Sequence, residues 1–193
     1  MKRNILALIL LLTLATFTAA QEKAVADRVK VEDGQSYLIL STKKMETMEK
    51  ELGEVAAKGF RVLYGAPTAT YDMAILLKRV EKIESQPYSY KLLGTVRNKT
   101  MEKELNDNAA QGYRLLPRTI IFKQGFLVAE LAMLMEREPN ARRGYEYKLI
   151  VARVETKLHK DIDAAIAEGF TPVTMITIGK NIVVMEKEIA LKQ

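Results

Sequence analysis

The sequence predicts an α+β protein in which three tandem β-α-β-β repeats pack as one body behind a signal peptide. Two observations indicate that the sequence is repeated. The letters Thr-Met-Glu-Lys-Glu-Leu occur at residues 47–52 and again at residues 100–105. A tyrosine precedes a glycine by 22 residues three times, in the pairs Tyr37–Gly59, Tyr90–Gly112 and Tyr147–Gly169. Self-similarity at a fixed spacing is the sequence signature of a repeat architecture.

Residues 1–20 have the layout of a secretory signal peptide. Lys2 and Arg3 precede a 13-residue stretch of apolar residues and threonine at 5–17, and small residues follow up to Ala20. A membrane anchor is the alternative, but a spanning helix needs about 20 apolar residues. We therefore expect an exported protein, periplasmic or secreted, that is cleaved near Ala20 and then has no membrane span.

Each repeat is expected to begin with a strand, at residues 37–41, 88–96 and 145–154. The first is short, and apolar and polar residues alternate in the other two. A helix should follow, since apolar residues recur in steps of three and four and form one stripe. The stripes are Met48, Leu52, Val55 and Ala56; Met101, Leu105 and Ala109; and Leu158, Ile162, Ala165 and Ile166. Asn98 and Thr156 are candidate N-caps. The glycines at 59, 112 and 169 are expected to end the helices, because glycine adopts a positive φ at little cost.

Two further apolar runs follow each glycine and predict two strands. The first runs are residues 60–64, 113–122 and 170–178, and the second are 71–80, 126–135 and 182–186. Gly, Pro and Asn residues at 65–67, 123–125 and 179–181 predict hairpin turns between them. Residues 126–135 are apolar on both faces of the strand, so a sheet face must be hidden against another repeat or a second copy of the chain.

Polar segments at 81–87 and 137–144 are interpreted as linkers. The resulting domains are the signal peptide 1–20, an N-terminal segment 21–36, repeats at 37–80, 88–136 and 145–188, and a tail 189–193.

The strand openings Tyr88-Ser89-Tyr90-Lys91 and Tyr145-Glu146-Tyr147-Lys148, with Ala-Glu-Gly-Phe at 167–170, resemble domain-of-unknown-function family 4177. That family has a short Tyr-Glu-Tyr-Lys strand, a helix that ends near Glu-Gly-Trp, and two further strands. The first repeat departs from it, with Leu38 in place of the lysine, and all three repeats have Phe or Tyr in place of the tryptophan. The resemblance implies a small β-α-β-β fold and brings no established activity or catalytic residue.

The composition removes several kinds of chemistry. The chain has 193 residues, a formal net charge of +6 and no cysteine, which excludes disulfides, thiolate nucleophiles and cysteine-bound metals. No Gly-x-Ser-x-Gly elbow or phosphate-binding glycine loop occurs. His159 could form a metal-binding stripe with Glu155 and Asp163, but a solvated helix face is the simpler interpretation. Glu130 lies in an apolar run, where it is either a buried functional acid or an edge-strand charge. We expect no cofactor, no bound metal and no catalysis.

The candidate ligand-binding residues are tyrosines at strand starts and two arginines: Tyr88, Tyr90, Tyr145, Tyr147, Arg114 and Arg118. Tyrosines give contact area at low entropic cost, and they are also good strand formers. Together with Arg61, Arg142 and Arg143, the two arginines could form a site that binds an anion.

Three functional hypotheses follow. The first is a binding protein for a protein or envelope component, and the alternative is a carrier of a small, anionic ligand in a cleft between repeats. The third, which we favour least, is an enzyme of unrecognised type centred on Glu130 or His159. Loss of the signal peptide lowers the net charge to +4, so no nucleic-acid partner is expected. A homo-oligomer is left open.

Overall fold

The computed structural model describes residues 29–70, 72–81, 86–95, 97–124, 129–177 and 179–190, with backbone alone at 123–124 and 129–130. The predicted signal peptide lies outside these residues. The chain divides into two compact units, Met1–Gln35 and Ser36–Gln193, and all three repeats lie in the second. Within the described residues, no helix is long and apolar enough to cross a membrane.

The first repeat consists of β1 (Tyr37–Thr42), α2 (Met45–Ala57), β2 (Phe60–Pro67) and β3 (Met73–Arg79). Its antiparallel sheet has the strand order β1-β3-β2. The last strand therefore lies in the centre of the sheet, between the first two.

The second repeat contains β4 (Ser89–Thr95), α3 (Asn98–Ala109), β5 (Arg114–Leu115), the 3₁₀ turn η1 (Pro117–Thr119), β6 (Ile121–Gln124) and β7 (Ala129–Arg137). The central strand is again the last one, because β7 pairs with β4 on one side and with β5 and β6 on the other.

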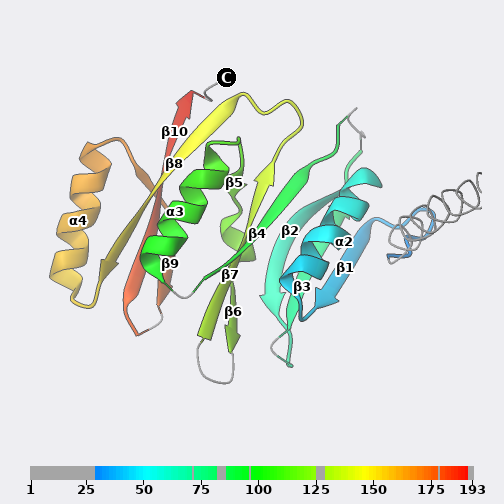
Figure 1. Ribbon diagram of the computed structural model, residues 1–193, viewed down its shortest axis with the longest axis horizontal. Coiled ribbons are helices and arrows are strands. Elements are labelled where there is room, and N and C mark those ends of the chain that lie inside the picture. The colour runs from blue at the N-terminus through cyan, green and yellow to red at the C-terminus, as the bar shows by residue number, and fades with distance from the viewer. Residues whose placement is uncertain are drawn as a thin grey trace, which may run out of the picture. The chain divides into compact units, whose positions relative to one another are not determined.

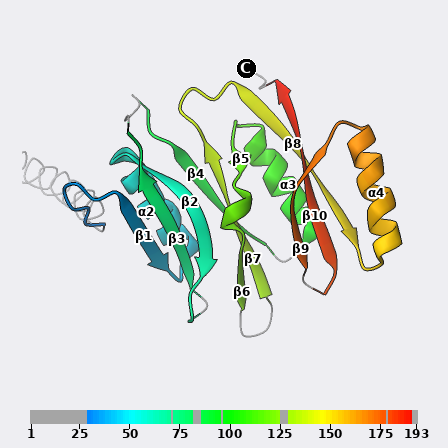
Figure 2. The same ribbon diagram turned by 180° about the vertical axis from the view of Figure 1, so that it is seen from behind.

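The third repeat consists of β8 (Arg143–Ala152), α4 (Glu155–Ala167), β9 (Thr171–Thr177) and β10 (Asn181–Ala190), with strand order β8-β10-β9. Figure 1 shows the three repeats following one another from right to left, and Figure 2 shows the same strands from behind. The predicted class is confirmed: the protein is α+β, with three antiparallel sheets in repeated β-α-β-β-like units.

The same glycine ends each helix, as the sequence predicts. Gly59, Gly112 and Gly169 have φ values of +83°, +86° and +91°, a region that a residue with a Cβ adopts only at a cost. The predicted N-caps are wrong, because Arg97 and Val154 hold the cap positions and no side chain caps either helix. Helix starts here depend on tertiary packing more than on a local capping signal.

Two predicted strand boundaries are also wrong. The run 113–122 is not one strand, since Pro117 opens the 3₁₀ turn η1 between β5 and β6. In that turn the buried Thr119 hydroxyl donates to the Leu116 carbonyl at 2.7 Å and accepts the Leu134 N–H at 3.2 Å. Residues 65–67 are not a hairpin turn either, because they continue β2 and pair with β3. Both features depend on contacts with distant strands.

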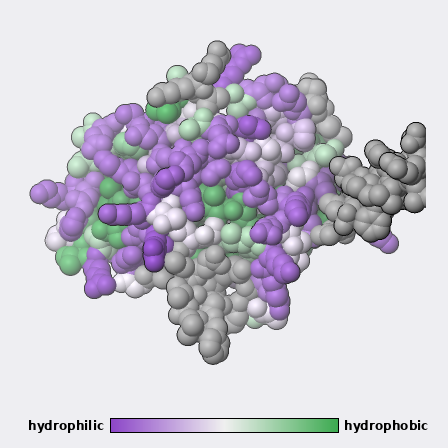
Figure 3. All heavy atoms as spheres, viewed as in Figure 1, coloured by the Kyte–Doolittle hydropathy of each residue, from purple (hydrophilic) through white to green (hydrophobic). Residues whose placement is uncertain are grey.

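Neighbouring repeats share a core. Helix α2 contacts both β1 of its own sheet and β4 of the next, and α3 likewise contacts β4 and β8. One buried cluster joins Leu105 and Met133 of the second repeat to Tyr147 and Val184 of the third. The second face of the third sheet is therefore covered by the preceding repeat. Hydrophilic side chains cover most of the described surface in the view of Figure 3.

At Gly65 the backbones of the first two repeats pack closely against each other. A Cβ at this position would lie 3.0 Å from the Thr119 Cα and 3.1 Å from the Ile121 Cδ1. We expect Gly65→Ala to lower the free energy of unfolding by about 1–3 kcal/mol, because the backbone of η1 would have to move. Urea unfolding measures the change.

Gly53 provides a control with the opposite sign. It lies inside α2, and a Cβ there would meet no atom within 4 Å beyond its chain neighbours and the backbone of its own helix. Gly53→Ala should raise stability by up to about 1 kcal/mol, through helix propensity alone. An equal response at both glycines would contradict the close approach at Gly65.

Candidate functional site

Two copies of one Arg–Tyr–Glu arrangement join the repeats. Each takes an arginine from the start of the second strand of one repeat, and a tyrosine and a glutamate from adjacent strands of the next. We call Arg61, Tyr90 and Glu136 the first triad, and Arg114, Tyr147 and Glu186 the second triad. The tyrosine and glutamate lie opposite each other in register in both cases, and such cross-strand pairs share one face of a sheet.

The first triad joins repeats 1 and 2. The Arg61 Nη2 lies 2.6 Å from the Glu136 Oε1, and its Nε lies 3.1 and 3.2 Å from the two carboxylate oxygens. The Tyr90 hydroxyl donates to the Glu136 Oε2 at 3.0 Å and accepts the Val62 N–H at 3.1 Å. The guanidinium also stacks on the Tyr88 ring, 4.5 Å from its centroid. One buried carboxylate thus holds groups from both repeats.

The second triad repeats this geometry between repeats 2 and 3. The Arg114 Nη2 lies 2.7 Å from the Glu186 Oε1, and the Tyr147 hydroxyl donates to the Glu186 Oε2 at 2.8 Å. That hydroxyl accepts the Leu115 N–H, also at 2.8 Å. Arg114 stacks on the Tyr145 ring at 5.0 Å. The hydrogen bond to Glu186 raises the pKa of Arg114 despite partial burial, so the arginine keeps its charge.

A helix glutamate completes each junction. Glu49 on α2 accepts the Leu92 N–H at 3.1 Å, and Glu102 on α3 accepts the Leu149 N–H at 2.8 Å. Both N–H groups belong to edge strands, β4 and β8, whose outer sides have no strand partner in their own sheets. The helix of one repeat thereby satisfies the strand edge of the next, which is one way proteins protect such edges.

The electrostatics of the first triad indicate a structural role. Glu136 is only 3% exposed, and burial raises its pKa although Arg61 and the Tyr90 hydroxyl act to lower it. Burial and the adjacent Glu136 charge raise the pKa of Tyr90. A carboxylate held by an arginine fork and a tyrosine has little capacity left to accept a proton from a substrate. The triad is therefore better suited to holding the two repeats together than to acid–base catalysis.

A pocket of about 700 Å³ is shared by the two triads. The arginine and glutamate of both triads line it, together with Tyr145, Val173 and the segment that connects β7 to β8. Asn140 in that segment has a φ of +57°, a conformation that asparagine tolerates better than most residues. The pocket thus has walls from all three repeats.

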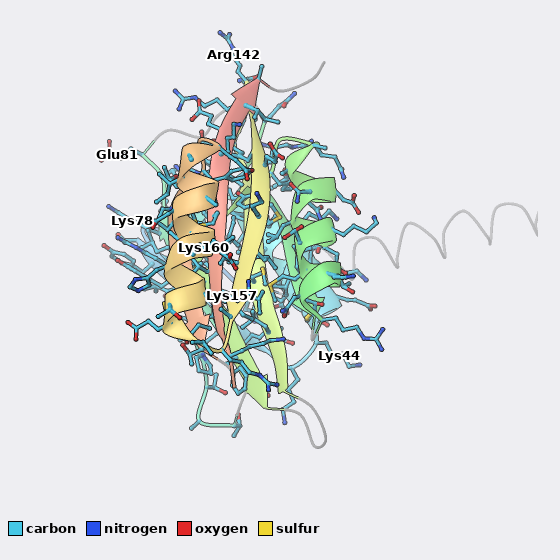
Figure 4. The ribbon with its side chains drawn as sticks, turned by 90° about the vertical axis from the view of Figure 1, so that its left-hand side faces the viewer. Lys44, Lys78, Glu81, Arg142, Lys157 and Lys160 are labelled. Atoms are coloured by element: carbon cyan, nitrogen blue, oxygen red, sulfur yellow. The ribbon has the colours of Figure 1, made fainter. Side chains whose placement is uncertain are left out.

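Positive charge in this pocket exceeds what its acids neutralise. Glu136 and Glu138 engage Arg61, and Arg143 pairs with Glu188 at 3.1 Å. Arg114 uses its Nε and Nη2 on Glu186, and its side chain is 54% exposed. Among the described residues, Arg142 takes part in no ion pair. It is one of the residues that line the pocket, and its side chain points away from the body of the protein (Figure 4). The outer edge of Arg114 and the Arg142 side chain are therefore the groups that could meet an anion.

The structure distributes the predicted ligand residues over four environments. Tyr90 and Tyr147 are buried in the triads, with hydroxyls that already make two hydrogen bonds each. Tyr145 and Arg114 line the pocket. Tyr88 is half-buried under Arg61.

Arg118 lies apart from the pocket, with its Nη1 3.0 Å from the Tyr64 hydroxyl. The role of Glu136 escapes sequence reasoning, although an acid near the end of the last strand in both the second and third repeats was a usable signal.

The structure describes the side chain of one of the two candidates for catalysis. His159 is exposed, and its Nε2 lies 3.7 Å from the Glu155 Oε1 on the same helix. Over the part of the chain that the structure describes, no three histidine, aspartate or glutamate side chains gather to hold a metal ion. The Glu130 side chain lies outside the described residues.

Comparison of the chain with family models, curated proteins and solved structures finds no match in any of the three.

Proposed function

We propose that this is an exported, non-catalytic binding protein that takes a small carboxylate- or phosphate-bearing molecule into the pocket between its repeats. The observation that carries the proposal is the state of Arg114. Glu186 and the Tyr145 ring fix its guanidinium, while the side chain stays half exposed on a pocket of about 700 Å³. That volume lies within the range of about 300–1,000 Å³ for small-molecule sites.

The chemistry of arginine favours an anionic ligand. Its planar fork of donors matches carboxylate and phosphate groups, and it cannot lose its charge at physiological pH. Because Glu186 and Tyr145 already hold Arg114 in place, a ligand would not have to order that side chain, which improves affinity. Arg142 in the pocket lining adds a second cation that could close on the ligand.

The burial of Tyr90 and Tyr147 favours this pocket over a protein or envelope component bound on a tyrosine surface. Flat recognition surfaces use exposed aromatic rings, and here two of the four candidate tyrosines are buried between repeats. The two triads also argue against an enzyme, since arginine and tyrosine donors already occupy both of their glutamates.

Titration of the chain 21–193 with citrate and with inorganic phosphate tests the proposal, with glycerol as the neutral probe. We expect citrate or phosphate to bind, and Arg142→Gln to weaken binding about tenfold through the loss of one charge-assisted hydrogen bond. Calorimetry gives the affinities. Arg118→Gln, outside the pocket, is the matched control and should bind as the unmodified chain does.

Two results would overturn the proposal. One is the absence of binding by both anions, and the other is equal weakening by Arg142→Gln and Arg118→Gln. Native mass spectrometry of the protein purified from its own host adds a separate observation. It should show a bound small molecule and an N-terminus at Gln21.

A further inference from the structure

The first repeat carries half of a junction that no other half meets among the residues that the structure describes. Tyr37 corresponds to Tyr90 and Tyr147, yet the residue opposite it on β3 is Lys78, where the other repeats have glutamate. Tyr37 is 53% exposed and the neighbouring Ile39 is 66% exposed. Figure 4 shows Lys78 pointing away from the ribbon. This end therefore keeps the tyrosine and has lost the acid that would hold an arginine.

The third repeat carries the other half, and it too is altered. Thr171 stands at the position of Arg61 and Arg114, directly after the aromatic residue that follows the helix glycine. Pro172 stands where Val62 and Leu115 donate their N–H groups to a tyrosine hydroxyl. Proline has no N–H, so this bond cannot form. His159 also replaces the glutamates that accept the edge-strand N–H groups.

We infer that the two ends of the array are caps, which prevent a second copy of the chain from adding in the way that the repeats join internally. Head-to-tail addition would bring Tyr37 and Lys78 against Thr171 and Pro172. The tyrosine hydroxyl would lose both its donor and its acceptor, and Lys78 would be desolvated without an acid. Buried polar groups left without partners are costly.

Such caps have a purpose because both ends still expose apolar side chains. Tyr37 and Ile39 are exposed at one end, and Ile166 and Met175 at the other. A head-to-tail contact that does not close into a ring produces open filaments. Replacement of the polar groups that fix the geometry is a form of specificity against the wrong partner, and terminal repeats of arrays are commonly modified in this way.

Repair of one end at a time tests the inference. The first variant, Lys78→Glu, restores the acid. The second, His159→Glu with Thr171→Arg and Pro172→Val, restores the groups of the first junction. All four positions are exposed, so the variants should fold. By sedimentation velocity each variant alone should remain monomeric, while an equimolar mixture should form a one-to-one dimer. The unmodified chain should stay monomeric at the same concentration.

The Tyr37 hydroxyl provides the control. Adding Tyr37→Phe to the Lys78→Glu variant should weaken the dimer at least about tenfold, because the backbone N–H that Pro172→Val introduces into the other variant would then have no acceptor. Two outcomes overturn the inference. One is a folded mixture that stays monomeric. The other is self-assembly of the unmodified chain that Ile39→Glu abolishes, because the ends would then bind a second copy rather than exclude it.

Discussion

Replacement of Arg61 by alanine is expected to lower the free energy of unfolding by about 3 kcal/mol, because it leaves the buried Glu136 carboxylate without its cation. The value is taken at the low end of the range for broken buried pairs, since Arg61 itself is 37% exposed. Urea unfolding at pH 7 measures it. Arg118→Ala is the control, because that arginine stacks on Tyr64 and bonds its hydroxyl at the surface. It should cost under about 0.5 kcal/mol.

A double variant separates the buried charge from the lost packing. Arg61→Ala combined with Glu136→Gln removes the charge that the single variant strands, while the amide oxygen can still accept the Tyr90 hydroxyl. The pair should recover a substantial part of the loss, as coupled residues do in a mutant cycle. If Arg61→Ala costs no more than Arg118→Ala, the first triad does not hold the repeats together.

The parts of the fold that could be predicted from sequence are those with a local cause. Helix stripes repeat every three or four residues, and the glycines that end the helices need a positive φ that their neighbours cannot adopt. The identical segments at 47–52 and 100–105 then allowed the elements predicted for one repeat to be assigned to the next. Each of these signals lies within a few turns of chain, and each proved sufficient for its element.

The features that could not be predicted depend on distant partners. Residues 65–67 have the composition of a turn, but pairing with β3 keeps them in a strand. The alternation of residues around Tyr90 would be the same whether that face of the strand met solvent or another repeat, so the pattern does not predict its burial. Its burial follows from the docking of repeat 1 through Val62 and Arg61, and no local pattern reports that contact. The pocket has the same origin, since two junctions and the segment after β7 form it together.

The buried tyrosines of the two triads should make the protein sensitive to alkali. The ordinary pKa of the phenol is 10.0, and burial raises it for both Tyr90 and Tyr147 in the folded chain. Above pH 10 the unfolded chain ionises these groups while the folded chain keeps its protons. The folded state then binds more protons, so stability falls as pH rises, by up to about 1.4 kcal/mol per pH unit for each tyrosine.

Comparison with Tyr90→Phe/Tyr147→Phe isolates this effect from the titration of lysines. At pH 8 the double variant should be less stable by about 1–3 kcal/mol per site, because the N–H groups of Val62 and Leu115 lose their acceptors. Urea midpoints measured from pH 8 to 11.5 should then converge with those of the unmodified chain. Leu105→Ala, a core variant that is destabilised by about 2–5 kcal/mol but keeps both tyrosines, should give a parallel curve instead. If the double variant also runs parallel, the hydroxyls ionise as readily in the folded chain as in the unfolded one, and the triads are open to water rather than sealed between repeats.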